Sequence, residues 1–471
     1  MTVLAIDQGT SGTKAIVVDD SGVVVGLAEI PVHPVYLADG GVEQDPGELL
    51  ESVLGAGRAA VAQAGRRIDA VSLANQGETV LAWDPDTGSP LSPAIVWQDR
   101  RAETVCAALQ DHGDELAART GLVLDPYFSA PKMAWLRRAV TTEGVVTTSD
   151  AWLLHQLTGA FVTDATTASR SLLTELGGHG WSHDLLALFG LTDERLPAVV
   201  GNDEIIGTTA AFGEEAPVGG VVVDQQAALL AESCLDPGTA KCTLGTGAFL
   251  LANTGGTGVR SSAGLTTSVA WRIAGRDTFC VDGQVYTAAS AVKWLTALGV
   301  IADAGEMDRV AAADAGSVMC VPALAGLAAP WWKPHATAML AGMTLSTERG
   351  HLVLAVLQGI AAQIAELVTA INADTGAPLT RLRVDGGLTR SSVLMQACAD
   401  LIQVPVDVYP SPHATALGAA GLAALSLHPD RPLGSVIPDW SPAATFDPAW
   451  SGDRAEEFRS QWRALAERTF Q

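Results

Sequence analysis

The stretch Leu4-Ala5-Ile6-Asp7-Gln8-Gly9-Thr10-Ser11-Gly12-Thr13-Lys14-Ala15-Ile16-Val17-Val18-Asp19 decides how this chain begins to fold. An apolar strand ends in an aspartate, glycine and hydroxyl residues turn the chain, and a second apolar strand follows. Such a turn offers backbone N–H groups and hydroxyls to an anion with little side chain in the way. The aspartate at its mouth could ligate a metal ion. The stretch therefore predicts a β-hairpin suited to phosphate groups.

The residues around this hairpin predict alternating strands and helices. Strands are expected over 3–9, 14–19 and 22–31. A helix is expected over 46–65, because Asp45-Pro46 supplies an N-cap and a proline at the first helical position. The apolar run over 69–75 is typical of a buried parallel strand. This alternation indicates an α/β fold.

The second half of the chain repeats the layout. Residues 239–251 read as strand, Gly/Thr turn and strand, and residues 382–387 as a strand that ends in a glycine pair, with a helix from about Ser391. Two glycine hairpins predict two related domains that face each other. Turn residues cluster over 234–238, so we place the domains at 1–233 and 234–471.

Composition narrows the function classes. A chain of 471 residues is too long for one compact core, and 48% hydrophobic with 17% charged residues is typical of a globular protein. The net charge of −24 argues against nucleic acid or an anionic membrane as a partner, since both would be repelled. An anionic nucleotide would have to be met by loop N–H groups, helix N-termini and a metal ion.

The cysteines and the N-terminus bear on the compartment. The six cysteines are scattered without a C-x-x-C pair, which argues against a zinc site or a disulfide framework. The sequence begins directly with a predicted strand, and we see no uninterrupted apolar run long enough to span a bilayer. We therefore expect a cytoplasmic protein with no membrane partner.

Four short elements could carry chemistry: the first hairpin, the run 222–229 around Asp224, the turn 244–247, and the run 384–387. Each alone fits an ordinary turn, a helix N-cap or a strand–helix junction. All four, however, lie at hairpin tips or at the carboxyl ends of strands, where α/β sheets bind ligands. The chain has no P-loop and no G-x-G-x-x-G followed by a helix, which disfavours a dinucleotide-dependent dehydrogenase.

These motifs, taken in order, resemble the FGGY carbohydrate kinases and, within them, the glycerol kinase branch. The resemblance spans nearly the whole chain. It rests on Asp7-Gln8-Gly9-Thr10, Asn75-Gln76-Gly77-Glu78-Thr79, Ala94-Ile95-Val96-Trp97-Gln98-Asp99-Arg100-Arg101, Asp125-Pro126-Tyr127-Phe128-Ser129-Ala130-Pro131-Lys132, Asp224-Gln225-Gln226-Ala227-Ala228-Leu229, Gly245-Thr246-Gly247, Ala329-Pro330-Trp331-Trp332, Val384-Asp385-Gly386-Gly387 and Thr415-Ala416-Leu417-Gly418-Ala419-Ala420.

The resemblance implies two actin-like (ribonuclease H-like) ATPase domains flanking a catalytic cleft. The substrate would lie mostly on the N-terminal domain and ATP mostly on the C-terminal one. The implied reaction transfers the γ-phosphate of ATP to a hydroxyl of a small polyol or sugar, with Mg²⁺ as the second cofactor. Asp224 would be the catalytic base, and Asp7 would hold Mg²⁺ with Asp224 nearby. The family leads us to expect a homo-oligomer, a dimer or a tetramer.

The resemblance also implies the ligand-binding residues. Around ATP it places Gly9, Thr10, Ser11, Thr13 and Lys14 of the first hairpin, Gly245 and Thr246 of the second, Ala289, Lys293, Gly386, Gly387 and Ser391. Around the substrate it places Gly77, Glu78, Trp97, Tyr127, Asp224, Gln225 and Phe249. Such a set suits a polyol, which needs acceptors for its hydroxyls and an apolar wall for its C–H face.

Gly77 departs from the family pattern, because glycerol kinases carry an arginine there that donates to glycerol. Loss of hydrogen bonds from a charged group, each worth about 1.5–3 kcal/mol, would weaken glycerol binding roughly ten- to a hundredfold. A glycine also predicts a larger pocket and so a substrate longer than glycerol. The alternative is that another cation or a water fills the gap and glycerol remains the substrate.

Two further features of the sequence and two alternative functions complete the expectations. Val223 stands before the predicted base where glycine is usual, and Trp331-Trp332 is expected to pack the domain interface. One alternative function is a ketose kinase of the xylulose type. Another is a non-catalytic actin-fold sensor of sugar or nucleotide, against which the retention of Asp7, Asp224 and both glycine loops argues.

Overall fold

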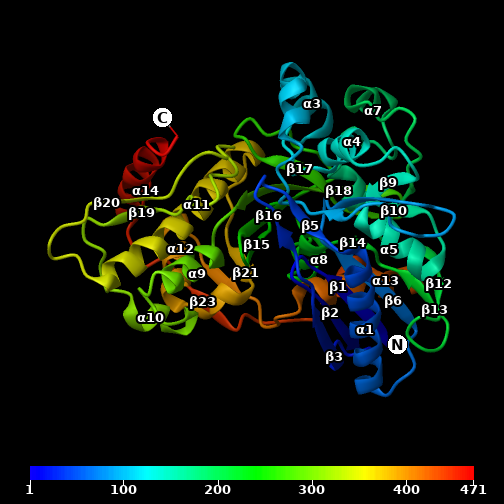
Figure 1. The fold of residues 1–471 in the computed structure, drawn as a ribbon. Coiled ribbons are helices and arrows are strands. Elements are labelled where there is room, and N and C mark those ends of the chain that lie inside the picture. The colour runs from blue at the N-terminus through cyan, green and yellow to red at the C-terminus, as the bar shows by residue number, and fades with distance from the viewer. Residues whose placement is uncertain (471) are drawn as a thin grey trace.

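A computed structural model describes residues 1–470, and it shows two halves that each contain a seven-stranded sheet (Figure 1). The first sheet runs in the order β12-β13-β6-β1-β2-β3, and β14 pairs with β6. Its strands are β1 Val3–Gln8, β2 Gly12–Val18, β3 Val24–Pro31, β6 Ala70–Asn75, β12 Ile205–Thr209, β13 Ala216–Gly219 and β14 Val222–Val223.

The second sheet runs in the order β17-β18-β16-β15-β21-β22-β23. Its strands are β15 Ala240–Leu244, β16 Ala248–Gly255, β17 Thr266–Ile273, β18 Arg276–Val285, β21 Leu382–Asp385, β22 Val406–Val408 and β23 Ala444–Phe446. Pairing repeats between the sheets: β1 is antiparallel to β2 and parallel to β6, while β15 is antiparallel to β16 and parallel to β21. This repeat confirms the predicted pair of related α/β domains.

A five-stranded sheet, ordered β4-β5-β8-β7-β9, also belongs to the first half. Helices α3 (Gly113–Thr120), α4 (Ser129–Ala139) and α7 (His183–Phe189) lie together at the top of the molecule in Figure 1. The strands of this sheet are β4 Val35–Tyr36, β5 Val42–Gln44, β7 Val80–Trp83, β8 Ala94–Ile95 and β9 Val145–Thr148; β10 Val162–Asp164 pairs with β11 Ala198–Val200, and β19 Met319–Val321 with β20 Met339–Ala341.

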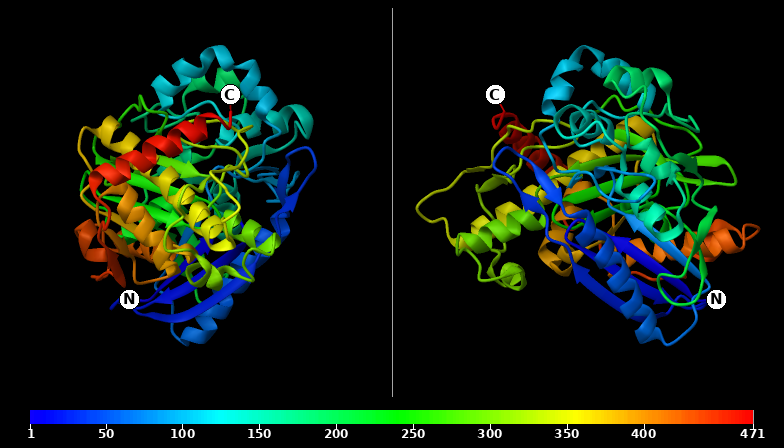
Figure 2. Two further views of the ribbon diagram at one scale, coloured as in Figure 1. Left: turned by 90° about the vertical axis from the view of Figure 1, so that its left-hand side faces the viewer. Right: turned by 45° about the vertical axis from the view of Figure 1, so that its right-hand side comes forward.

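The α-helices of the described residues pack around these sheets (Figures 1 and 2). They are α1 Pro46–Ala64, α2 Glu103–Ala108, α3 Gly113–Thr120, α4 Ser129–Ala139, α5 Ser149–Thr158, α6 Ala165–Ser169, α7 His183–Phe189, α8 Asp224–Ala231, α9 Ala289–Ala297, α10 Met307–Val310, α11 Arg349–Thr375, α12 Ser392–Ile402, α13 Ala414–Leu427 and α14 Gly452–Glu467.

Local signals set the ends of α1. The Asp45 side chain accepts hydrogen bonds from the N–H groups of Gly47 and Glu48, and Pro46 takes the first helical position. Gly65 ends the helix in the left-handed region, with φ 59°, where a side chain would be strained. The observed helix therefore matches the prediction over 46–65 to within one residue.

Helix α13 comes after the predicted domain boundary in the sequence, yet it packs on the sheet of the first half. Ala416 and Ala420 share one apolar cluster with Val3, Ala5 and Ile16. The orange helix lies beside the blue strands in the views of Figure 2. The chain thus returns to the first half after building the second, and the division at 233 and 234 stays a prediction.

Among residues 1–470, α11 is the helix long and apolar enough to cross a membrane, and 89% of its most apolar window is buried inside the fold. It is a core helix of the second half.

The prediction that Trp331 and Trp332 pack the domain interface was wrong. Trp331 and Trp332 pack on the core of the second half, where Trp331 meets Trp462 at 5.8 Å between rings and Trp332 donates to the Gly264 carbonyl at 2.7 Å.

Candidate active site

A cavity of about 230 Å³ brings together residues from both halves. It lies where the two glycine hairpins approach the start of α8 and the loop after β6. All the residues predicted to bind substrate, and the tips of both hairpins, line it. The lining residues are Thr10, Ser11, Pro34, Tyr36, Gln76, Gly77, Glu78, Trp97, Gln98, Tyr127, Asp224, Gln225, Thr243, Gly245, Thr246 and Phe249. We call this the acceptor cavity.

The first hairpin is closed by a hydrogen bond from the Gly9 N–H to the Gly12 carbonyl at 3.0 Å. Thr10 and Ser11 at its tip line the acceptor cavity. Thr13 is buried and bonds the Ser52 hydroxyl in α1 at 2.7 Å instead. The tip is thus available to a ligand, while Thr13 ties the hairpin to the helix behind it.

The second hairpin joins β15 to β16 through Gly245, Thr246 and Gly247. A Cβ on Gly247 would lie 2.4 Å from the Val285 carbonyl, so only glycine allows β18 this close. Helix α9 begins against the same turn, where the Ala289 N–H donates to the Gly245 carbonyl at 3.0 Å. The backbone of Ala289 thus supports the hairpin.

The remaining predicted nucleotide residues lie outside the acceptor cavity. Gly386, with φ 96°, passes so close to β15 that a Cβ there would lie 2.5 Å from the Leu244 carbonyl, whereas a Cβ on Gly387 would meet nothing within 4 Å. Ser391 is buried as the N-cap of α12 and bonds Asp308 at 2.5 Å. Gly9, Thr13, Lys14, Ala289 and exposed Lys293 are also absent from the cavity wall.

Asp224 is the first residue of α8, at the end of β14, and it lines the acceptor cavity. The Gln225 N–H donates to its carboxylate at 2.7 Å. Burial raises the pKa of Asp224, and the positive charge of Lys241 opposes that rise. Buried Lys241 also donates to the Gln225 side chain at 2.5 Å, which fixes that amide at the cavity wall. A carboxylate so placed could accept a proton from a bound hydroxyl.

Asp7 is the penultimate residue of β1 and lies close to Asp224. Burial and then the negative charge of Asp224 raise the pKa of Asp7 to about 7, opposed by Lys14, its neighbour across the hairpin. Asp385 at the end of β21 adds negative charge to Asp7. Mg²⁺ is commonly held by one or two carboxylates plus phosphate oxygens, so the neighbouring carboxylates of Asp7 and Asp224 suit a magnesium ion.

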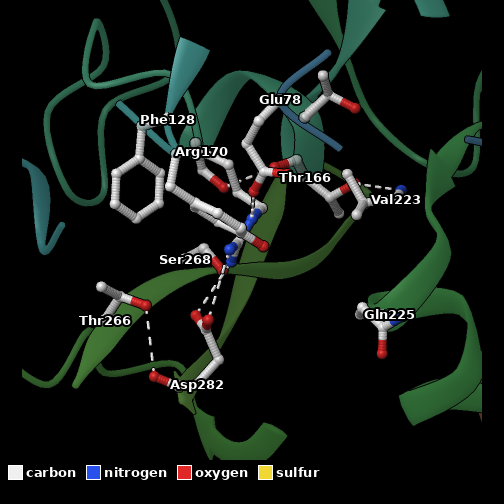
Figure 3. Close-up of polar contacts among 12 residues, drawn as sticks. Glu78, Phe128, Thr166, Arg170, Val223, Gln225, Thr266, Ser268 and Asp282 are labelled. Carbon is white, nitrogen blue, oxygen red and sulfur yellow. Dashed lines mark hydrogen bonds and ion pairs between the residues drawn. The ribbon is translucent and has the colours of Figure 1, made fainter. Parts of the chain in front are cut away.

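Glu78 lies in the loop between β6 and β7 with φ 60°, a left-handed conformation that is uncommon outside glycine and typical of functional sites. Its carboxylate is paired with the guanidinium of Arg170, which follows α6. Figure 3 shows this guanidinium between Glu78 and Asp282, to which it bonds at 3.0 Å. Burial raises the pKa of Glu78, and Arg170 opposes that rise.

Aromatic rings form the apolar wall of the cavity. Trp97 meets Tyr127 at 5.6 Å and Phe249 at 5.8 Å between ring centroids, both edge to face. The Trp97 indole N–H donates to the Thr10 hydroxyl at 2.9 Å. The wall thus joins Trp97 and Tyr127 of the first half to Phe249 on β16 of the second half.

The larger pocket expected from Gly77 stays a prediction. A Cβ on Gly77 would lie 3.3 Å from Cγ1 of Val223, so even a small side chain at this position needs Val223 to shift by a few tenths of an ångström. Room exists in another direction. A cavity of about 410 Å³ lies beside the acceptor cavity and shares Trp97, Gln98 and Tyr127 with it.

The sequence reading missed Arg170, Lys241 and Asp282, which are all buried. Arg170 and Lys241 are the cations that hold Glu78 and Gln225. The sequence does hold a signal for Lys241, because it is a lone charged residue inside the apolar strand 240–244. Arg170 carries no such signal, because its partners Glu78 and Asp282 lie 92 and 112 residues away in sequence.

Two phosphate-type hairpins, buried carboxylates and an aromatic wall around one cavity define a phosphotransferase with an alcohol group as acceptor, built on a two-domain α/β fold. The chain belongs to the FGGY family of carbohydrate kinases: the model of the family's N-terminal domain matches residues 2–231, and that of its C-terminal domain matches residues 240–427. Members of this family use ATP as the phosphoryl donor.

Similar proteins support the assignment over the full length. A glycerol kinase of Bordetella parapertussis is 42% identical, with 99% of this chain and 96% of the relative covered, and a glycerol kinase of Thermus brockianus is 41% identical over 99% and 98%. The structure of Plasmodium falciparum glycerol kinase with ADP matches with a TM-score of 0.92 at 32% identity, covering 100% of this chain and 98% of that one. A xylulose kinase from Rhodospirillum rubrum matches with a TM-score of 0.86 at 25% identity, covering 99% and 98%.

Proposed function

We propose that this protein transfers the γ-phosphate of ATP to a hydroxyl of an uncharged polyol or sugar bound in the acceptor cavity. The observation that carries the proposal is that Asp224, the Glu78 carboxylate and the tips of both glycine hairpins line one cavity. Phosphoryl transfer needs in-line positioning and donors around the spreading negative charge rather than covalent chemistry by the protein.

The residues that line the cavity take different roles in the proposed phosphoryl transfer. Asp224 takes the proton from the attacking hydroxyl, and Glu78 accepts hydrogen bonds from neighbouring hydroxyls of the acceptor. Trp97 and Phe249 pack on its C–H face. Thr246 and the tip of the first hairpin, on the two sides of the cavity, donate to the phosphoryl group in transit.

Mg²⁺ fits the carboxylates of Asp7 and Asp224, and it would neutralise charge on the ATP phosphates when bound. Lys241 limits the rise in the pKa of Asp224 and so helps to keep that carboxylate ionised as a base. Closure of the cavity around its ligands would exclude water, which otherwise competes as the phosphoryl acceptor.

The wall of the acceptor cavity favours an uncharged acceptor. Its charged residues, among those described, are Glu78 and Asp224, and no lysine or arginine lines it. An anionic sugar acid would meet repulsion there, whereas the hydroxyls of a polyol can donate to both carboxylates. The adjoining cavity past Trp97 gives room for four or five carbons and favours a ketose kinase of the xylulose type as the second candidate. We further propose a cytoplasmic homo-oligomer, as the family resemblance implies.

The test is ADP release with ATP and a panel of glycerol, tetritols, pentitols and pentuloses, using the parent and Asp224→Asn. We expect Asp224→Asn to lower kcat by about 10²–10⁴-fold, the usual contribution of a general base. The matched control is Asp236→Asn, an exposed carboxylate in the loop that follows α8, which should retain parental kcat. Full activity of Asp224→Asn would remove Asp224 from the mechanism, and no turnover of any acceptor by the parent would favour the non-catalytic sensor.

A further inference from the structure

The side chain that position 77 can accommodate is limited by a neighbouring side chain and not by the backbone conformation of Gly77. Its φ lies outside the left-handed region, so its own conformation suits any residue. The one obstacle is Val223, whose Cγ1 would lie 3.3 Å from a Cβ at position 77. A contact that short is tighter than ordinary packing, so a side chain at 77 requires Val223 to give way.

Val223 has little freedom to give way. It is 2% exposed, and its backbone pairs with Asn75 across β14 and β6. Its N–H donates to the Thr166 hydroxyl at 2.9 Å, a contact drawn in Figure 3. Thr166 is in turn held by Asp164, so the segment in front of Asp224 is fixed on both sides. A β-branched side chain on such a strand also has few rotamers to choose from.

The absence of a side chain at position 77 affects the charge of the cavity wall as well as its shape. Because position 77 carries no side chain, the wall of the acceptor cavity beside Glu78 consists of backbone. The nearest guanidinium is that of Arg170, which is committed to Glu78, Asp282 and Ser268 and does not line the cavity. Inside the acceptor cavity the acceptor is therefore met by carboxylates and amides and by no cation, while Arg100 lines the adjoining cavity.

We propose that Val223 is a specificity-determining residue that acts through Gly77: its side chain occupies the space a residue at 77 needs, which keeps a cation out of the acceptor cavity and selects an uncharged acceptor longer than glycerol. Gly77 and Val223, the two departures from the family pattern, therefore depend on each other, because the valine side chain fits only beside a glycine. This inference rests on the proposed kinase function for its consequence, while the coupling itself is a property of the fold.

The first experiment measures the coupling without any activity. Thermal unfolding is compared for Gly77→Ala, Val223→Ala and the double variant, with Val222→Ala as a matched control that loses the same methyl groups on the neighbouring strand position. We expect Gly77→Ala to lower the unfolding midpoint when Val223 is present but not when residue 223 is alanine, and to lower it equally with or without Val222→Ala. Purely additive effects at 77 and 223 would overturn the proposal.

The second experiment measures specificity. We expect Gly77→Arg alone to lower kcat/KM for every acceptor at least tenfold, since Val223 must shift to admit even the Cβ of the arginine. Gly77→Arg with Val223→Ala should recover activity and shift the ratio of kcat/KM for glycerol over pentitols at least tenfold toward glycerol. The same shift in Gly77→Arg alone would overturn the proposal. If the parent turns over no acceptor, the proposed function fails by itself, and the ratio is then measured from calorimetric Kd values for glycerol and a pentitol.

Discussion

The indole N–H of Trp97 donates to the Thr10 hydroxyl at 2.9 Å, so the aromatic wall of the acceptor cavity is tied to the tip of the first glycine hairpin. A displacement of the hairpin must therefore displace the wall against which the acceptor packs. This contact gives a direct route by which phosphate binding and acceptor binding can support each other.

The first prediction tests this contact. Thr10→Ala and Trp97→Phe each remove the hydrogen bond, worth about 0.5–1.5 kcal/mol, and should raise KM for the acceptor about two- to tenfold. The double variant should cost less than the sum of the two, because the bond can be lost only once. Thr10→Ser keeps the hydroxyl and serves as the control. Additive effects in steady-state kinetics would show that the contact does not contribute.

A second prediction concerns Arg170, which neutralises two buried carboxylates from different halves of the chain. Arg170→Gln leaves Glu78 and Asp282 unpaired and should destabilise the fold by about 3–5 kcal/mol. Arg170→Lys keeps the charge but not the fork of donors, so it should be milder in stability and still raise KM for the acceptor.

The matched control for Arg170 is Arg272, which forms a buried ion pair with Asp277 at 2.6 Å and does not line the acceptor cavity. Arg272→Gln should destabilise the protein without changing KM for the acceptor. Thermal unfolding and acceptor kinetics on the same preparations separate the two effects. Equal KM values in Arg170→Lys and the parent would leave Arg170 with a role in stability alone.

A third prediction concerns the proposed metal site. Asp7→Asn removes one carboxylate, so the Mg²⁺ concentration for half-maximal activity should rise about tenfold or more, with a lower kcat. Asp20→Asn, an exposed carboxylate past the same pair of strands, should leave both unchanged. Binding of Mn²⁺ in the presence of ADP, followed by electron paramagnetic resonance, gives an independent readout. Unaltered Mn²⁺ affinity in Asp7→Asn would contradict the assignment.

Much of the fold could be predicted because its signals are local. Strands predicted over 3–9 and 14–19 are observed at Val3–Gln8 and Gly12–Val18, since apolar runs and a glycine turn set both their ends. The glycine spacing around Gly245 likewise placed the second hairpin.

The rest depends on contacts between distant residues, for which one sequence holds no signal. Nothing local in 414–427 says that α13 leaves the second half to cover the first sheet. Gly77 and Val223 each stood out as departures, but only the structure shows that they touch. Ser391 is the N-cap of α12, and its contact with a nucleotide stays a prediction.

The last prediction follows from Asp150, whose buried carboxylate lies in the first turn of α5. One oxygen accepts from the Thr163 hydroxyl at 2.6 Å, while the other has no partner among the described residues. Burial, followed by the negative charge of Asp164, raises the pKa of Asp150 from 3.8 to about 6. Between these two values the folded state holds a proton that the unfolded state has released, so this residue's contribution to stability is lost as pH rises through about 6.

Asp150→Asn should therefore stabilise the protein at pH 7.5, by up to about 3 kcal/mol, since one pKa unit corresponds to about 1.4 kcal/mol. The asparagine oxygen can still accept from Thr163, and it brings no charge into the core. Near pH 4 the aspartate is itself protonated in the folded state, so the gain should vanish there. Thermal unfolding of both proteins at pH 4 and pH 7.5 measures the difference. Asp164→Asn is the contrasting variant: Asp164 accepts from the Thr166 N–H as the cap of α6, so its loss should destabilise at pH 7.5. A lower midpoint for Asp150→Asn at pH 7.5 would mean that the ionised carboxylate is satisfied where it lies.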